Sequence, residues 1–209
     1  MIHVLLLDDH AVVRAGYRQL IDAEPDMSVV AEASGSAQAC EALRQHVVDV
    51  AVVDLSLKDD SGLEAVRRMR ARVPGLKVLV FTMHAHSGYA LQALRAGALG
   101  YLTKDSDPAR MLDAVREVAQ GRRVFSAEVM HGVLGETAEG RGPLAQLTPR
   151  EFEVLRLAVE GQAIRSIAAS LKLSEKTVFN TMSLIRRKLD APSDFQLLRI
   201  AARYGLVQL

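Results

Sequence analysis

Short, uninterrupted hydrophobic runs alternate with amphipathic stretches over the first 121 residues of the chain. Continuous apolar runs of this length are typical of strands that are buried on both faces of a parallel sheet. The predicted strands are Val4–Leu7, Val29–Ala33, Val50–Val53, Val78–Phe81 and Gly100–Leu102. Between them, apolar residues recur at helical spacing, and Ser61 with Glu64 forms a helix-start signal. The pattern predicts a doubly wound α/β domain with a five-stranded parallel sheet.

The pattern changes after this region. The stretch Gly135–Gly142 is rich in Gly, Glu and Ala, and we interpret residues 123–145 as a linker that contains one short helix at Ala127–Leu134. The rest of the chain shows only helical periodicity. The expected organisation is therefore an α/β domain at residues 1–122, the linker, and an all-α domain at residues 146–209.

Four helices are predicted in the C-terminal domain. Thr148 is the N-cap of the first, and Glu151 completes a capping box. A short helix at Ile164–Leu171 is followed by a tight turn and a longer helix that Ser174 caps, and Ser193 caps the last helix. A short helix, a turn and a longer helix form a candidate helix-turn-helix.

Charge is divided unevenly between these parts. Residues 144–209 hold ten Lys/Arg and six Asp/Glu, a net charge of +4, whereas residues 1–143 carry a net charge of −3. A basic C-terminal part favours a polyanionic partner for that part alone.

The single cysteine, Cys40, excludes an internal disulfide. No apolar run approaches the ~20 residues of a membrane span, and the N-terminus lacks a signal peptide's basic start, so we expect a soluble, cytoplasmic protein with no membrane partner.

Polar residues follow four of the five predicted strands. Asp8 and Asp9 end the first hydrophobic run, Asp54 ends the third, Thr82 the fourth and Lys104 the fifth. Because the carboxyl ends of parallel strands share one edge of the sheet, these five side chains are predicted to meet there.

Carboxylates gathered in this way predict a divalent cation site, with Mg²⁺ as the expected ion. Asp9 and Asp54 are candidate direct ligands, Asp8 is a candidate for holding a metal-bound water, and the backbone carbonyl of Ser56 is a further oxygen donor. We interpret His84, in the loop after the fourth strand, as an ordinary loop residue rather than a ligand.

The same cluster predicts phosphoryl transfer. Asp54 is the candidate nucleophile and phosphoacceptor, and Lys104 and the Thr82 hydroxyl are the candidate donors to the transferring oxygens. An aspartate-nucleophile phosphohydrolase would use similar groups, but it would need a substrate pocket and a second catalytic acid, and the sequence offers neither. We therefore expect no enzyme beyond the domain's own phosphoryl transfer and slow dephosphorylation.

Residues 1–121 resemble the receiver domain of bacterial two-component response regulators. The matching motifs are LLLDDH at 5–10, VVDLSL at 52–57, Gly62, FTMH at 81–84 and GYLTKD at 100–105. The resemblance implies that a sensor histidine kinase phosphorylates Asp54, that Thr82 turns toward the phosphoryl group, and that Tyr101 then rotates inward. This chain departs from the family at Leu57 and Lys58, where a Met-Pro pair is frequent.

Residues 147–206 resemble the LuxR-type helix-turn-helix of the NarL/FixJ regulators. The matches are LTPREFEVLRLAVEG at 147–161, SIAASLKLSEKTV at 166–178 and IRRKLDAPS at 185–193. Helical spacing sorts the longer helix: Val178, Met182, Ile185 and Leu189 form its core face.

The other side of this helix is predicted to enter the major groove of double-stranded DNA. Asn180 is a candidate for pairing with an adenine edge and Phe179 for contacting a thymine methyl group. Phe179 and Thr181 stand where the family commonly has Lys and His. The candidate DNA-binding residues are Lys176, Thr177, Phe179, Asn180, Ser183, Arg186, Arg187 and Lys188.

These features together predict a transcription regulator whose phosphorylation controls homodimerisation and DNA binding, with RNA polymerase as a further candidate partner. The aliphatic face of the last helix, at Leu197, Leu198 and Ala201, is either the dimer surface that the resemblance implies or part of the core. A receiver-based scaffold that no longer binds DNA remains the alternative.

Overall fold

The chain divides into two compact units in a computed structural model. The structure describes residues 1–58, 60–85, 87–126, 143–204 and 206–207. The first unit comprises residues 1–85 and 93–126, and the second comprises the described residues of 86–92 and 127–209. The helix expected at Ala127–Leu134 lies outside the described residues.

The first unit is built on a parallel sheet with the strand order β2-β1-β3-β6-β7-β8. Its strands are β1 (Ile2–Leu7), β2 (Met27–Ala33), β3 (Val50–Val53), β6 (Lys77–Thr82), β7 (Gly100–Thr103) and β8 (Val124–Phe125). The first five confirm the predicted strands, and the order reverses between β1 and β3, as in a doubly wound fold. The sixth strand was not predicted, because two residues are too few to show a pattern. They pair with Gly100 and Tyr101 at the edge of the sheet.

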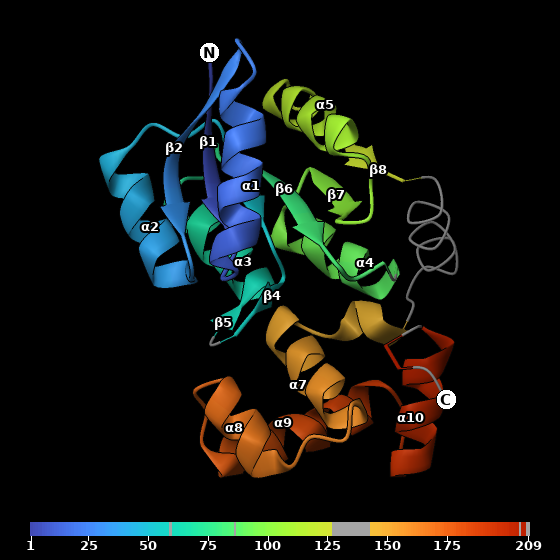
Figure 1. Ribbon diagram of the computed structural model, residues 1–209. Coiled ribbons are helices and arrows are strands. Elements are labelled where there is room, and N and C mark those ends of the chain that lie inside the picture. The colour runs from blue at the N-terminus through green and yellow to red at the C-terminus, as the bar shows by residue number, and fades with distance from the viewer. Residues whose placement is uncertain (59, 86, 127–142, 205, 208–209) are drawn as a thin grey trace. The chain divides into compact units, whose positions relative to one another are not determined.

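Helices cover both faces of this sheet (Figure 1). They are α1 (Ala11–Asp22), α2 (Ser36–Gln45), α3 (Gly62–Arg72), α4 (Ser87–Ala96) and α5 (Pro108–Ala119). Val4 and Leu6 of β1 share one core cluster with Ile21 of α1 and Met111 of α5. Leu5 and Leu7, whose side chains point to the opposite face of the sheet, are also buried. Both faces of the strands are therefore apolar, which explains their uninterrupted hydrophobic runs.

Local signals set the helix starts. The Ser61 hydroxyl accepts a hydrogen bond from the Glu64 N–H at 3.3 Å, and Asp107 accepts one from the Ala109 N–H at 2.8 Å.

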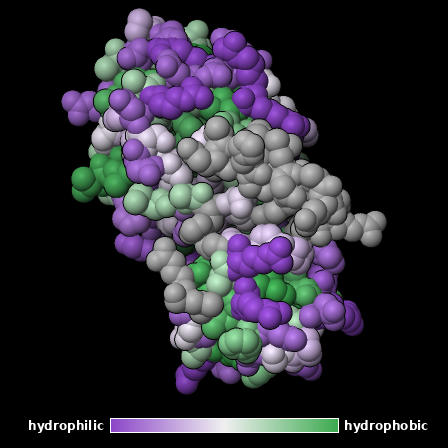
Figure 2. Space-filling view, turned by 90° about the vertical axis from the view of Figure 1, so that its right-hand side faces the viewer, coloured by the Kyte–Doolittle hydropathy of each residue, from purple (hydrophilic) through white to green (hydrophobic). Residues whose placement is uncertain are grey.

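Figure 2 shows the outside of the first unit as mostly hydrophilic on the face drawn, with only small hydrophobic areas. A two-stranded hairpin of β4 (Ser56–Leu57) and β5 (Asp60–Ser61) follows β3.

The second unit contains the four predicted helices. They are α7 (Pro149–Val159), α8 (Ile164–Ser170), α9 (Glu175–Lys188) and α10 (Asp194–Arg203), preceded by the 3-10 turn η1 (Pro143–Gln146). The predicted capping box is present: the Thr148 N–H donates to Glu151 Oε2 at 2.7 Å, and the Glu151 N–H donates to Thr148 Oγ1 at 3.2 Å. Lys172, with φ at 53°, makes the tight turn between α8 and α9. None of the described helices combines the length and the apolar character needed to cross a bilayer.

The aliphatic face of α10 belongs to the core of this unit. Leu197 is 3% exposed and Ala201 is fully buried, whereas Phe195 is 74% exposed. The dimer-surface alternative is therefore wrong for Leu197 and Ala201, and the core alternative is confirmed for these two residues, whereas Leu198 is only partly buried. Burial of both residues in the core accounts for the periodic aliphatic pattern, which by itself does not say what the face packs against.

Candidate functional site

The ends of four neighbouring strands, β1, β3, β6 and β7, bring the predicted polar residues together. Leu7 and Val53 are aligned in the register of β1 and β3, and the Asp54 N–H donates to the Leu7 carbonyl at 2.8 Å. On the other side of β6, the Lys104 N–H donates to the Thr82 carbonyl at 2.8 Å. Parallel pairing thus places the polar residues at the carboxyl ends of all four strands on one edge of the sheet, as predicted.

Lys104 joins the two buried aspartates at this edge. Its Nζ lies 2.6 Å from Asp8 Oδ2 and 2.6 Å from Asp54 Oδ2. The three side chains are only 9%, 8% and 2% exposed, respectively. Burial lowers the pKa of Lys104, but the hydrogen bonds to Asp54 and Asp8 outweigh it, so its pKa lies above the ordinary lysine value. The ammonium therefore stays charged and offsets the repulsion between the two carboxylates.

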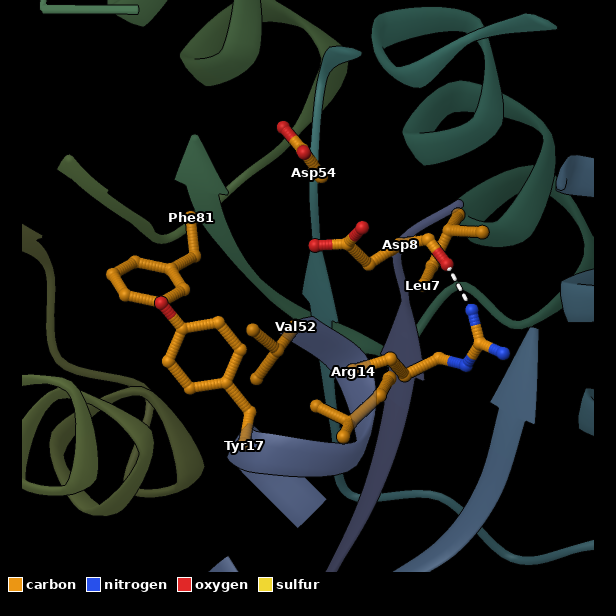
Figure 3. Close-up of a pocket in the computed structure, with 8 residues that line it drawn as sticks. Leu7, Asp8, Arg14, Tyr17, Val52, Asp54 and Phe81 are labelled. Atoms are coloured by element: carbon orange, nitrogen blue, oxygen red, sulfur yellow. Dashed lines mark hydrogen bonds between the residues drawn. The ribbon is translucent and has the colours of Figure 1, made fainter. Parts of the chain in front are cut away.

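A small hollow lies beneath the two carboxylates (Figure 3). Asp8 and Asp54 line it together with an aromatic pair, Tyr17 and Phe81, whose ring centroids are 4.9 Å apart in an edge-to-face arrangement. Its volume of about 10 Å³ is roughly the space of one water molecule. The Arg14 guanidinium donates to the Asp8 carbonyl at 2.5 Å and so ties the β1 end to α1. No substrate of appreciable size fits in this hollow.

The chemistry of Asp9 fits a divalent cation. Its side chain is 7% exposed, and its Oδ1 accepts no hydrogen bond from the described residues, although His10 Nδ1 lies 2.9 Å away. An unpaired buried carboxylate oxygen is costly unless a cation or water satisfies it. Asp8, Asp9 and His10 form a group whose candidate ligand atoms lie within 4.8 Å of one another. Asp54 is linked to this group through Lys104 and Asp8. Sequence reasoning missed His10, although its position directly after two acids was the available signal.

Lys58 gives a structural meaning to one departure from the receiver pattern. Its backbone N–H donates to Asp9 Oδ2 at 3.0 Å. A proline at this position, as in many receivers, has no N–H and could not make this hydrogen bond. The departure therefore adds an orienting contact to a candidate metal ligand.

The predicted switch residues are connected through His84. The Tyr101 side chain is fully buried, and its hydroxyl donates to the His84 carbonyl at 2.6 Å. Ser56 Oγ lies 3.1 Å from His84 Nε2, and the His84 N–H makes a long hydrogen bond of 3.5 Å to Thr82 Oγ1. His84 thus links the loop after Asp54 with both switch residues, a role that the sequence did not reveal. Tyr101 already has the inward orientation that the resemblance associates with phosphorylation.

In the second unit, α9 separates a core face from an exposed face. Val178, Met182, Ile185 and Leu189 are buried, which confirms the predicted core face. The exposed predicted DNA-binding residues are Lys176, Thr177, Phe179, Asn180, Ser183 and Arg187.

Two predicted phosphate-binding residues of α9 have protein partners instead. Lys188 Nζ lies 2.6 Å from Glu151 Oε2, and Arg186 is ion-paired with Asp194. Their charges are therefore partly compensated within the unit. These pairings depend on how α9 lies against α7 and α10, which helical spacing alone does not specify.

A doubly wound domain with two acids and a lysine at its carboxyl edge, followed by a helix-turn-helix unit, defines the response-regulator class. Comparison with known proteins agrees with this. Residues 4–116 match the model of the response regulator receiver domain, and residues 145–201 match that of the bacterial regulatory proteins of the luxR family. The chain belongs to the NarL/FixJ family of response regulators, with a receiver domain and a LuxR-type DNA-binding domain.

Its relatives include transcription regulators of similar length. The chain is 33% identical to the response regulator UvrY of Escherichia coli strain K12 over 99% of this chain and 96% of UvrY. It is similar to the structure of RcsB from Salmonella enterica serovar Typhimurium bound to promoter P1flhDC with phosphomimetic BeF3⁻, with a TM-score of 0.71 and 27% identity over 97% of this chain and 98% of RcsB. A structure of two RcsB dimers bound to two parallel DNAs matches with a TM-score of 0.62 and 25% identity, over 96% of this chain and 98% of that one.

Proposed function

We propose that Asp54 accepts a phosphoryl group from a sensor histidine kinase and that this controls dimerisation and DNA binding. The observation that carries the proposal is the contact of the Lys104 ammonium with Asp54 at 2.6 Å, at the edge where Asp8 and Asp9 also lie. We assign residues 1–122 to the receiver domain, 123–145 to the linker and 146–209 to the DNA-binding domain. We place the protein in the cytoplasm, where its DNA and RNA polymerase are found.

In the transfer step, a carboxylate oxygen of Asp54 forms a bond to phosphorus while the bond between phosphorus and the donor imidazole nitrogen breaks. The displaced electron pair stays on the donor nitrogen, which takes up a proton. Asp54 Oδ1 is held by the Ser56 N–H at 3.0 Å, so the carboxylate is oriented before the donor arrives. Lys104 then transfers its hydrogen bond to a phosphoryl oxygen, where negative charge develops.

Asp8 and Asp9, with the Ser56 carbonyl and Asp54 itself, are the residues proposed to hold Mg²⁺. The buried Oδ1 of Asp9, which accepts no hydrogen bond from the described residues, supports this assignment. Bound Mg²⁺ would supply further charge neutralisation on the phosphoryl oxygens. The Thr82 hydroxyl, with only one long hydrogen bond among the described contacts, is free to reorient toward the phosphoryl group, and Tyr101 would transmit this change through His84.

Labelling with a small phosphodonor tests the acceptor. The full chain, incubated with acetyl phosphate and Mg²⁺, should gain one phosphoryl group by intact mass and lose it slowly. Asp54→Asn should abolish the gain, whereas Asp49→Asn, at the opposite end of β3, should label normally. Full labelling of the Asp54→Asn variant would show that the assigned nucleophile is wrong, and rapid turnover of the donor would favour a phosphohydrolase.

We further propose that the exposed face of α9 reads double-stranded DNA as part of a dimer. Lys176 and Arg187 would neutralise phosphates, Asn180 would pair with an adenine edge and Phe179 would cover a thymine methyl group. Phe179 is 56% exposed, so its entry into the groove would bury apolar ring surface and favour binding. The RcsB structures on DNA support this function for the family fold.

Selection of DNA from a random library with the phosphorylated full chain tests this second part. We expect an enriched motif, which Asn180→Ala should relax at one position without abolishing binding. Failure to enrich any sequence, together with normal phosphorylation, would favour the scaffold alternative. The control Gln45→Ala, which removes an exposed amide at the end of α2 in the first unit, should leave the motif unchanged.

A further inference from the structure

One lysine at the end of α9 joins three helical segments of the second unit. Lys188, in the last turn of α9, contacts Glu151 in the first turn of α7 and the Gln146 carbonyl of η1. We infer that Lys188 is a positioning residue: it holds α9 at a fixed angle within the unit and so contributes to the discrimination between DNA sequences rather than to the attraction for phosphates. The inference rests on the proposed function, because it takes α9 as the helix that reads DNA.

The Lys188 ammonium uses its hydrogen-bonding capacity within the unit. Its Nζ lies 2.8 Å from Glu151 Oε1, 2.6 Å from Glu151 Oε2 and 3.2 Å from the Gln146 carbonyl. A lysine ammonium carries three N–H donors, and these three oxygens match them in number. To bind a phosphate, Lys188 would have to leave a carboxylate whose side chain is only 7% exposed, and a nearly buried charge without its partner is costly.

Glu151 is a fixed anchor for this contact. The capping box with Thr148 holds the carboxylate on the first turn of α7. Burial raises the pKa of Glu151, but the hydrogen bonds from Lys188 and the Thr148 N–H outweigh burial, so the pKa lies below the ordinary value. The carboxylate is therefore ionised at neutral pH and forms an ion pair with the ammonium.

The apolar contacts of α9 leave a motion that this ion pair restricts. Val178, Met182 and Ile185 are buried and keep α9 on the core of the unit. Hydrophobic attraction is non-directional, so these side chains oppose separation of the helices more strongly than a small tilt. Hydrogen bonds are directional and weaken when their distance and angle change. The contacts of Lys188 therefore restrain the direction of α9 relative to α7 and η1.

The distance between Lys188 and the residues proposed to read bases gives this restraint its importance. Asn180 lies eight residues before Lys188 in the same helix, which corresponds to about 12 Å along the axis. A tilt of about 5° at the last turn would move Asn180 by about 1 Å. Hydrogen bonds to base edges accept a range of only about 0.5 Å, whereas attraction to phosphates acts over about 10 Å. Loss of the restraint should weaken base reading far more than phosphate attraction.

Binding of the phosphorylated full chain to two DNA duplexes tests the inference. One duplex carries the motif that the wild type enriches, and the other is a scrambled sequence of the same composition. Fluorescence anisotropy gives both affinities at several salt concentrations. Lys188→Met should weaken binding to the motif by roughly tenfold and binding to the scrambled duplex by less than about twofold, with an unchanged salt dependence. Lys176→Met, which removes an exposed lysine of α9, should weaken binding to both duplexes and lower the salt slope by about one.

Glu151→Gln gives a second test, in which Lys188 keeps its charge. The amide oxygen can still accept the Thr148 N–H, so the cap remains while the ion pair is lost. The positioning role predicts weaker binding to the motif and little change on the scrambled duplex. Tighter binding to both duplexes would show that the released lysine contacts phosphate, and the inference would be overturned.

Three results for Lys188→Met would also overturn it: unchanged affinity for the motif, an equal loss on both duplexes, or a salt slope lower by about one. An equal loss is the result of a merely structural role, because a smaller folded fraction lowers binding to both sequences alike. The wild type separates this outcome from the proposed function. A wild type that binds both duplexes equally would reject DNA reading by α9 itself, whereas discrimination that survives in Lys188→Met would reject only the positioning role.

Discussion

Lys104→Met isolates the role of the buried ammonium that joins Asp8 and Asp54. The substitution keeps most of the apolar stem and removes the charge, leaving two nearly buried carboxylates without their shared partner. Removing one partner of a buried ion pair typically costs about 3–5 kcal/mol. Asp54 keeps its hydrogen bond from the Ser56 N–H and Asp8 keeps one from the His10 N–H, so we expect the lower end, about 3 kcal/mol.

A divalent cation should reverse much of this loss. In the wild type, the Lys104 ammonium already occupies one oxygen of Asp8 and one of Asp54, and a cation at these carboxylates competes with it. Saturating ligand at about 100 times its Kd stabilises a protein by about 2.7 kcal/mol. Because the variant has no competing ammonium, Mg²⁺ should bind it more tightly and stabilise it by more than it stabilises the wild type.

Urea unfolding, followed by circular dichroism with EDTA and then with Mg²⁺, measures both effects. The difference in unfolding free energy between wild type and Lys104→Met should be largest with EDTA and should shrink with Mg²⁺. The control Lys77→Met removes a lysine that binds the Ala119 carbonyl, and its smaller cost should not depend on Mg²⁺. A Lys104→Met variant as stable as the wild type in EDTA, or a difference that grows with Mg²⁺, would refute the reasoning.

The pH dependence has a definite sign. The pKa of Lys104 is higher in the folded chain than the ordinary value of 10.5, because its hydrogen bonds to Asp54 and Asp8 outweigh the effect of burial. Its contribution to stability is therefore complete below the unfolded pKa and is lost as pH rises through the raised folded value. The wild type should lose stability above about pH 10.5 more steeply than Lys104→Met.

Three further changes test local features of both units. Gly62→Ala should lower the unfolding free energy by about 3 kcal/mol, because an added Cβ would lie 2.4 Å from backbone atoms just after β3. The control Gly75→Ala places its Cβ in open space and should be nearly neutral. Equal losses of stability for the two variants in denaturant unfolding would contradict this reasoning. Lys58→Pro should cost about 1 kcal/mol more than Lys58→Ala, because only proline removes the N–H that binds Asp9; equal stability of the two would show that this hydrogen bond contributes nothing. Glu151→Gln should make the loss of stability at acid pH less steep. Burial raises the pKa of Glu151, but the hydrogen bonds from Lys188 and the Thr148 N–H outweigh burial, so the pKa in the folded chain lies below the ordinary value and the stability that Glu151 contributes is lost as pH falls below about 4.3. An equally steep loss in the variant, measured by unfolding at a series of pH values, would count against this assignment.

Much of the fold was readable from the sequence because its signals are local. Runs such as Val50–Val53 are apolar at every position because helices cover both faces of the sheet. The caps at Ser61 and Thr148 act within one helical turn, so their hydrogen bonds follow directly from residue types and spacing. The two-residue β8 escaped detection because it carries no such signal and depends on pairing with β7.

The sequence by itself also determined which residues reach the carboxyl edge of the sheet, because strand ends in a parallel sheet lie side by side whatever their separation along the chain. Only the tertiary structure decided the partners: Lys104 between Asp8 and Asp54, His10 beside Asp9, and Lys188 on Glu151 instead of on the exposed face. It also placed Leu197 of α10 in the core. Periodicity specifies the direction in which a side chain points, but contacts between distant segments depend on packing geometry that no local pattern contains.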